Sequence, residues 1–221
     1  MKTRKYVAGL SAVLAGSLLF TSCVQKNYYN ANPHNNNGTT NGYTNTFDEE
    51  FNGGDNYGWT FTDVPDSAYA TITGGNYQYV NYSTTLSNMS TVNTDANTTG
   101  NFIVKTNIKS NNQMGLIFGA SSTDNGYAFY LDSTGSYSLY KEGTGTTAST
   151  VIVAPTSDSA YVIKKGWNVI ELDQVNGVWT FYINGTQAFQ MAARSIRGSN
   201  FGFKILPGTT GYADYLQVQS N

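Results

Sequence analysis

The sequence predicts an all-β domain, either a sandwich or a barrel, of about fourteen short strands. Across residues 47–219, apolar and polar residues alternate with a period of two, and Gly, Asn, Ser and Thr separate the alternating runs. Tyr, Thr, Val, Ile and Phe, which suit a pleated and half-buried surface, dominate these runs. No stretch of twelve or more residues in this region shows a sustained helical period with caps. Many short strands joined by tight turns are typical of β-sandwiches and β-barrels.

The expected strands follow one another at short intervals. In chain order they lie near 46–51, 57–62, 68–73, 76–82, 101–109, 113–120, 126–132, 136–142, 148–153, 166–175, 177–183, 186–191, 201–206 and 211–219. In "GVWTFYING", Trp179 and Phe181 lie on one face of a strand, and Asn184-Gly185 can adopt the positive φ angles of a type I′ turn. This pattern predicts a β-meander and not a binding site.

A second hairpin is expected in "NGYAFYLDSTGSYSLYK", residues 125–141. Because side chains alternate across a strand, Phe129 and Leu131 are expected in the core. Tyr130, Asp132 and Tyr140 then lie on the opposite and more exposed face.

The first residues are typical of an export signal, which we expect to span 1–22. Three cations near the N-terminus precede an apolar run over 6–20, which is too short to cross a bilayer comfortably. Small residues directly before Cys23 resemble the lipobox of bacterial lipoproteins, in which the Cys is acylated and becomes the mature N-terminus. The alternative is an ordinary signal peptide with an incidental Cys. Since Cys23 is the only cysteine, the exported domain has no intramolecular disulfide.

Residues 23–46 are expected to form a disordered tether, and residues 47–221 a single domain. The tether is rich in Asn and has no hydrophobic period, so it cannot bury enough surface to offset its ordering entropy. We expect an exported protein with a lipid anchor in a bacterial membrane, most simply the outer membrane of a Bacteroidetes-like cell. The sequence does not distinguish between the periplasmic and the outer face of that membrane. The chain carries a net charge of −2 with no basic cluster, which argues against nucleic acid as a partner.

Several motifs in the domain together resemble the concanavalin A-like lectin/glucanase superfamily, the jelly-roll fold that includes laminin-G-like modules. The motifs are "GLIFGA" (115–120), "GYAFYLDSTGSYSLYK" (126–141), "IKKGWNVIEL" (163–172), "GVWTFYING" (177–185), "GSNFGFKI" (198–205) and "ADYLQV" (213–218). The resemblance implies a two-sheet antiparallel jelly-roll β-sandwich with six or seven strands in each sheet. It also implies that the first and last strands, "TFDEEF" (46–51) and "ADYLQV", are neighbours.

The glucanase branch of this superfamily suggests an enzymatic alternative. Its retaining members carry Glu-x-Asp-x-Glu on one strand, since retention needs two carboxyl groups about 5 Å apart. Here Glu171 and Asp173 would share a strand face, but the second glutamate is replaced by Val175 or, in a bulged register, by Asn176. Asn cannot exchange a proton at neutral pH, so the sequence favours a protein without this catalysis. The only histidine, His34, lies in the tether, so the domain has no histidine-based triad or metal site.

No cofactor is expected, although calcium is conceivable because oxygen ligands suffice for it. Asp48, Glu49 and Asp214 would lie near one another if the terminal strands pair. The favoured interpretation of these residues is charge on an edge strand, which deters edge-to-edge pairing.

A carbohydrate-binding surface is the favoured functional hypothesis, with a glycan or another polar ligand as the partner. Sugar sites need flat aromatic faces and a few polar partners. The chain has 17 Tyr, of which Tyr130 and Tyr140, beside Asp132, are the best candidates; Tyr82 and Asn81 form a second set. The alternatives are a structural or protein-interaction lipoprotein of the cell envelope and a glucanase-type glycoside hydrolase. The tryptophans are expected in the core or at sheet ends: Trp59, Trp167 and Trp179.

Overall fold

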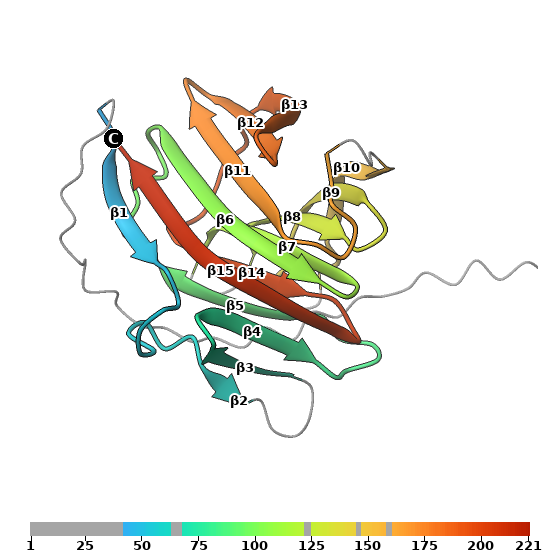
Figure 1. Cartoon of the computed structure of the whole chain (residues 1–221). Helices are drawn as coiled ribbons and strands as arrows, with labels where there is room; N and C mark the ends of the chain where they lie inside the picture. Colours follow the sequence, from blue (N-terminus) through green and yellow to red (C-terminus); the bar gives the residue numbers. More distant parts are fainter. Residues whose placement is uncertain (1–41, 63–67, 122–124, 145–146, 158–160) are drawn as a thin grey trace, which may run out of the picture.

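The computed structural model describes residues 42–62, 68–121, 125–144, 147–157 and 161–221 (Figure 1). The expected signal peptide, Cys23 and nearly all of the expected tether lie outside these ranges. Within them every regular element is a β-strand, and there is no helix that is long and apolar enough to cross a membrane. The all-β prediction is therefore confirmed.

The strands form two antiparallel sheets. The larger contains β1 (Thr44–Glu49), β2 (Phe61–Thr62), β3 (Ala68–Thr73), β4 (Asn76–Asn81), β6 (Phe102–Ser110), β11 (Asn168–Val175), β12 (Val178–Ile183), β13 (Thr186–Ala192) and β15 (Thr209–Ser220). Its order is β13-β12-β11-β6-β15-β4-β3-β2, with β1 also paired to β15. The smaller contains β5 (Asn88–Asn93), β7 (Gln113–Ala120), β8 (Tyr127–Asp132), β9 (Ser136–Lys141), β10 (Thr150–Ser157) and β14 (Asn200–Ile205). Its order is β10-β9-β8-β7-β14-β5.

The described strands number fifteen, against about fourteen predicted, and the sheets hold nine and six strands in place of six or seven each. The unpredicted strand is β5, which pairs with β14. Its sequence, NMSTVN, is mostly polar, so its alternation carries no clear signal. Residues 57–62 contribute only the two-residue β2 at the edge of the larger sheet.

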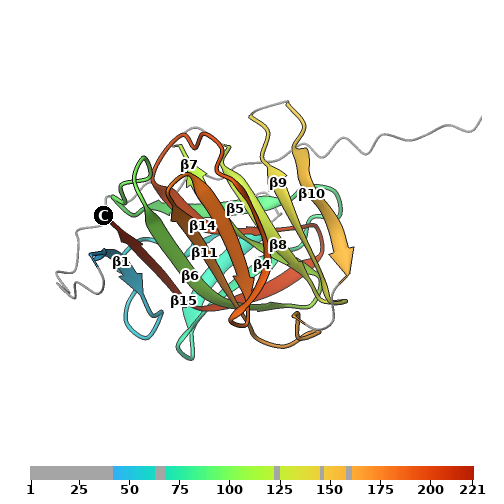
Figure 2. The ribbon, with the colours of Figure 1, turned by 90° about the horizontal axis from the view of Figure 1, so that it is seen from above.

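The first and last strands are neighbours, as the resemblance implied. Phe47 lies opposite Val218 and Glu49 lies opposite Leu216 in an antiparallel ladder with one bulge. In both views, β1 and the C-terminus lie at one end of the molecule, and β9 and β10 lie at the other end (Figures 1 and 2).

The core between the sheets is strongly aromatic. Trp59, in the segment before β2, and Trp179 of β12 are fully buried, and each contacts a ring from the six-stranded sheet. The ring centroid of Trp59 lies 5.7 Å from that of Phe203, and the ring of Trp179 meets Phe118 edge-on at 5.1 Å. Rings of this size remove much apolar surface from water, and they join the two layers without a disulfide.

The Asn184-Gly185 turn has the predicted geometry, with φ angles of 52° and 77°. The Asn184 side chain has a further role that the sequence does not reveal. Its Oδ1 accepts a hydrogen bond from the Val169 backbone N–H at 2.9 Å, and its Nδ2 donates to the Tyr161 carbonyl at 2.8 Å. The turn therefore also holds the segment that enters β11.

Candidate functional site

The outer face of the six-stranded sheet carries a row of paired residues from four strands. Lys204 of β14 lies opposite Gly115 of β7, Gly115 lies opposite Tyr130 of β8, and Tyr130 lies opposite Ser138 of β9. Directly paired residues share a face, so these side chains point away from the main core. Tyr130 belongs to a small apolar cluster of its own, separate from the main core.

A pocket of about 160 Å³ opens above this row. Its lining combines two aromatic rings, three uncharged polar side chains, one apolar side chain and one pair of opposite charges, namely Tyr130, Tyr140, Ser87, Gln113, Ser149, Leu206, Glu142 and Lys204. The lining comes from strands β7, β8, β9 and β14 and from the segments next to them.

Glu142 and Lys204 form a buried ion pair in this pocket. Their exposed fractions are 5% and 4%, and the Lys204 ammonium donates a hydrogen bond to Glu142 Oε2. Ser149 Oγ donates to the same oxygen at 2.7 Å, and the Tyr130 hydroxyl donates to Glu142 Oε1 at 3.1 Å. Burial of two charges is costly unless they are paired and hydrogen-bonded, and this network meets that condition.

The Tyr130 hydroxyl is held in its protonated form. Burial raises the pKa of Tyr130 well above its ordinary value, and the negative charge of Glu142 raises it further. Tyr130 is therefore a constant hydrogen-bond donor to the Glu142 carboxylate at physiological pH.

The two tyrosine rings meet edge to face. The centroids of Tyr130 and Tyr140 are 5.7 Å apart with an interplanar angle of 79°, and Tyr140 is half-buried. Gly115 makes room for this arrangement, because a Cβ atom there would lie 2.7 Å from Tyr130 Cδ1. The pocket thus presents part of the Tyr140 ring beside a preorganised charged network.

The structure brings Tyr130 and Tyr140 together on one face, as the hairpin pattern predicted. The expectation that Tyr130 is exposed was wrong, since only 4% of it is accessible. Asp132 lies on the same face but does not line the pocket. Its Oδ1 accepts a hydrogen bond from the Thr134 backbone N–H at 2.6 Å, which is a turn contact.

The two residues of the second predicted set, Tyr82 and Asn81, differ in their exposure to solvent. The Asn81 side chain is 1% exposed, and its amide donates to the carbonyls of Leu86 and Leu206. The prediction that Asn81 faces a ligand was therefore wrong, because its side chain holds a loop together. Tyr82 is 66% exposed, and its ring packs against that of Tyr69 with centroids 5.8 Å apart.

The sequence reasoning did not identify Glu142, Lys204 or Gln113. Lys204 offered a signal, because it is the one charged residue in the strand NFGFKI, whose six residues are all buried. A lysine in such a strand requires a buried acceptor. Glu142 is distant in sequence and follows the end of β9, so nothing local indicates that it is this acceptor.

Glu171 and Asp173 lie on the other side of the molecule, on the outer face of the nine-stranded sheet. Lys105 Nζ lies 3.1 Å from Glu171 Oε2. Burial raises the pKa of Asp173 to about 6, and the charge of Glu171 adds to this effect while Lys105 opposes it. The next position on that strand face is Val175, which carries no carboxyl group. The three-carboxylate strand of the glucanase branch is therefore incomplete here.

The predicted calcium alternative is not assembled. Asp48 and Glu49 are successive strand residues and point to opposite sides, with Glu49 buried and accepting a hydrogen bond from the Phe51 backbone N–H at 2.8 Å. Asp48 accepts instead from Gln217 Nε2 at 3.2 Å. Asp214 Oδ2 accepts a hydrogen bond from Asn107 Nδ2 at 3.3 Å. Among the described residues, no three His, Cys, Asp or Glu side chains are close enough to hold a metal ion.

Comparison with known proteins supports the fold through solved structures. No family model and no curated protein matches the sequence. The CBM2 module of the evolved Dit of Lactobacillus casei BL23 phage J-1 has a TM-score of 0.54 and 9% identity, covering 80% of this chain and 95% of that chain.

Two sugar-cleaving enzymes are also similar in structure. A GlcNAcα1-4Gal-releasing endo-β-galactosidase from Clostridium perfringens has a TM-score of 0.51 and 10% identity, covering 82% of this chain and 64% of that chain. The catalytic domain of the endo-1,3-β-glucanase (laminarinase) of Thermotoga petrophila RKU-1 has a TM-score of 0.50 and 10% identity, covering 81% and 98%. These likenesses confirm the two-sheet antiparallel jelly-roll β-sandwich, and at such low identity they show the fold alone.

Proposed function

We propose that this concanavalin A-like jelly roll is a non-catalytic glycan-binding module, and that the pocket over the six-stranded sheet is its sugar site. One observation carries the proposal: a buried ion pair, Glu142 and Lys204, lies in a solvent-open pocket beside the half-exposed ring of Tyr140. Buried charge is expensive for a purely structural surface, whereas it suits recognition of a polar ligand. The similarity of the fold to a carbohydrate-binding module and to glucanases supports the same ligand class.

Each part of the lining fits a sugar. The Tyr140 ring offers an apolar face for the C–H patch of a pyranose. Glu142 accepts hydrogen bonds from sugar hydroxyls, Lys204 donates to them, and Gln113 can do both. The pocket is smaller than the roughly 300–1,000 Å³ of common small-molecule sites, so it fits one sugar ring and not a long segment of chain.

The carboxyl groups favour binding over hydrolysis. Glycoside hydrolysis requires two carboxyl groups on either side of the scissile bond. Among the described residues, Glu142 is the one carboxylate that lines the pocket, and it is neutralised by Lys204. Glu171 and Asp173 belong to the opposite sheet and do not contribute to this site.

We place this module on a membrane through the predicted acylation of Cys23, with the Asn-rich segment as a spacer. A lipid anchor of more than one acyl chain would hold the protein stably at the surface. The function would then be to hold a glycan close to the cell envelope.

A glycan-array screen of the full chain tests the proposal, with Tyr140→Ala as the site variant. Tyr182→Ala is the matched control, because Tyr182 is a half-buried strand tyrosine on the outer face of the other sheet. We expect selective glycan binding that Tyr140→Ala abolishes and Tyr182→Ala preserves. Absence of glycan binding by the folded protein, or equal binding by both variants, would contradict the proposal. The structural or protein-interaction alternative would then lead.

A further inference from the structure

The outer face of the nine-stranded sheet carries a second and larger pocket, of about 380 Å³. Its lining is formed by Lys109, Ser110, Asn111, Lys165, Thr210 and Tyr212. Lys109 of β6 lies directly opposite Tyr212 of β15, so the two side chains share this face. The pocket shares no lining residue with the one over the six-stranded sheet.

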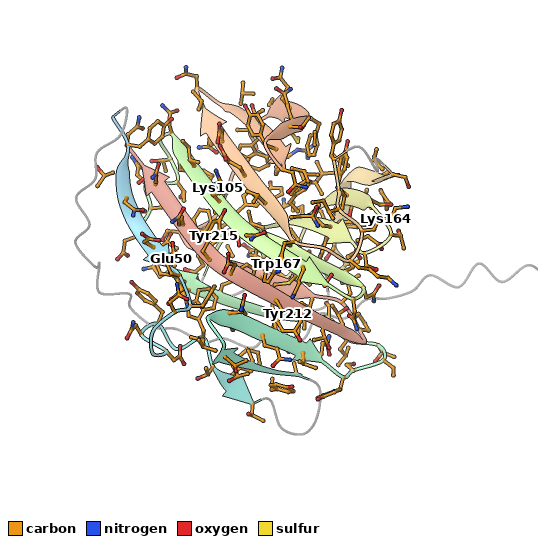
Figure 3. All side chains as sticks on the ribbon, in the orientation of Figure 1. Glu50, Lys105, Lys164, Trp167, Tyr212 and Tyr215 are labelled. Atoms are coloured by element: carbon orange, nitrogen blue, oxygen red, sulfur yellow. The ribbon has the colours of Figure 1, made fainter. Side chains whose placement is uncertain are left out.

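Lys109 contacts two aromatic rings. Its ammonium lies 4.5 Å from the ring centroid of Trp167 and 4.8 Å from that of Tyr212. Figure 3 shows Trp167 and Tyr212 near one another on the face of the larger sheet that is turned to the viewer. Cation–π contacts with both rings restrict the position of the ammonium of Lys109, which is one of the residues that line the pocket. Trp167 was expected in the core or at a sheet end; it precedes β11 and is partly exposed, unlike the fully buried Trp59 and Trp179.

The two lysines of this pocket, Lys109 and Lys165, form no ion pair with any of the described residues. No carboxylate lines it, and the ion pairs found among the described residues, Lys105 with Glu171 and Lys204 with Glu142, use other lysines. Asp132 lines an adjoining hollow together with both Lys109 and Lys165, but it forms an ion pair with neither, and its Oδ1 accepts a hydrogen bond from the Thr134 backbone N–H. Two ammonium groups that form no ion pair and line a concave site favour an anionic ligand.

The rest of the lining identifies the class of anion. Ser110, Asn111 and Thr210 supply hydroxyl and amide groups, which suit the hydroxyls of a sugar. The exposed parts of Tyr212 and Trp167 supply ring surface, which suits sugar C–H groups. We infer that this pocket binds an acidic glycan, with a uronate carboxylate or a sulfate ester on Lys109 and Lys165 and the sugar ring against Tyr212. This site is independent of the proposed sugar pocket on the other sheet.

Intrinsic tryptophan fluorescence of the full chain provides a direct test. Trp59 and Trp179 are fully buried, so a change on addition of ligand reports mainly on Trp167. The probes are a galacturonate oligosaccharide, a sulfated galactose oligosaccharide and an uncharged galactose oligosaccharide of the same length. Anionic phospholipid vesicles form a fourth probe, since their headgroups also carry acidic oxygens.

We expect saturable binding of at least one acidic oligosaccharide, weakened by added salt, and no response to the uncharged one. Lys109→Met and Lys165→Met should each weaken binding by about tenfold or more, because each removes hydrogen bonds to a charged group. Lys141→Met is the control, since it removes the same charge from an exposed position on β9. Trp167→Phe should remove the fluorescence response while calorimetry still detects binding.

Three results would overturn the inference: equal binding of charged and uncharged oligosaccharides, unchanged affinity in both lysine variants, or binding of vesicles with no binding of either acidic oligosaccharide. Circular dichroism of each variant separates loss of binding from loss of folding. Tyr140→Ala should leave the Trp167 response unchanged, so this inference and the proposed function can fail separately.

Discussion

Lys204 and Glu142 are 62 positions apart in sequence, and they form a buried ion pair on the outer face of the six-stranded sheet. Lys204→Met would leave the Glu142 charge buried without its partner, which should lower the free energy of unfolding by about 3–5 kcal/mol. The double variant Lys204→Met/Glu142→Gln removes both charges and keeps an acceptor for Tyr130. We therefore expect its free energy of unfolding to return much of the way to the wild-type value. Urea unfolding followed by circular dichroism measures each value.

Lys105→Met is the matched control for this experiment. It breaks the more exposed pair with Glu171, in which 43% of the lysine side chain is accessible. Exposed pairs contribute roughly 0–1 kcal/mol, so the control should be close to wild type. A Lys204→Met protein as stable as the control would mean that the buried pair is not energetically important.

Gly115→Ala tests the fit between β7 and the Tyr130 ring. The new Cβ would lie 2.7 Å from Tyr130 Cδ1 and 2.9 Å from the Phe129 carbonyl oxygen, so the ring and the neighbouring strand must both shift. We expect a loss of about 1–3 kcal/mol in stability together with weaker glycan binding. Gly53→Ala is the control, because the nearest atom there is 3.8 Å away. Unaltered glycan binding in a folded Gly115→Ala protein would argue against a role for the Tyr130 position.

Asp173 should make the stability of the protein depend on pH. Burial raises its pKa from 3.8 to about 6, so its favourable contribution is complete below about pH 4 and is lost as the pH rises through 6. Asp173→Asn cannot ionise, and it should therefore be more stable than wild type at pH 7 by about 1 kcal/mol, allowing for partial exposure to solvent. Chemical unfolding at pH 4, 5, 6 and 7 measures the difference.

The sign of this effect is the critical result. The difference in free energy of unfolding between Asp173→Asn and wild type should be smallest near pH 4 and should increase toward pH 7. Asp48→Asn also removes one carboxylate from an outer face, and it controls for the change in net charge. An advantage that shrinks as the pH rises would show that Asp173 is stabilised in its ionised form.

Cys23→Ala tests the predicted anchor. If Cys23 is acylated, wild-type protein should partition into the detergent phase and incorporate labelled palmitate in a bacterial host, whereas the variant should do neither. Ser22→Ala changes the adjacent position without removing the thiol and should behave like wild type. Detergent partitioning of Cys23→Ala equal to that of wild type would favour an ordinary export signal with an incidental cysteine.

The sequence predicts the sheets well because strand periodicity is a local property. Period-two patterning places Tyr130 and Tyr140 on one face and Phe129 on the other, and the Asn184-Gly185 turn follows from the φ angles that these residues tolerate. Strand β5 was not predicted because its apolar residues, Met89 and Val92, face opposite sides of the sheet. The alternation that marks a one-sided strand is therefore missing.

The two pockets depend on tertiary contacts, and no local sequence pattern indicates these contacts. Periodicity cannot show that Glu142, beyond the end of β9, covers the outer face and meets Lys204 of β14. For the same reason it predicts an exposed Tyr130, which this network buries. Trp167 was expected in the core or at a sheet end, and it directly precedes β11, but periodicity could not show that its ring contacts Lys109 of β6.

The pairing of β1 with β15 also determines how the domain would respond to tension. A pull on the N-terminal segment enters at Thr44, which lies opposite Ser220, and runs along a ladder whose buried anchor is Phe47. The first barrier to forced extension is thus the separation of these two strands. Because β15 is also hydrogen-bonded to β6 and β4, it would stay in place when β1 peels away. If the chain is anchored through Cys23, it could lengthen by one strand under load while both pockets, neither of which is lined by β1, keep their lining residues in place.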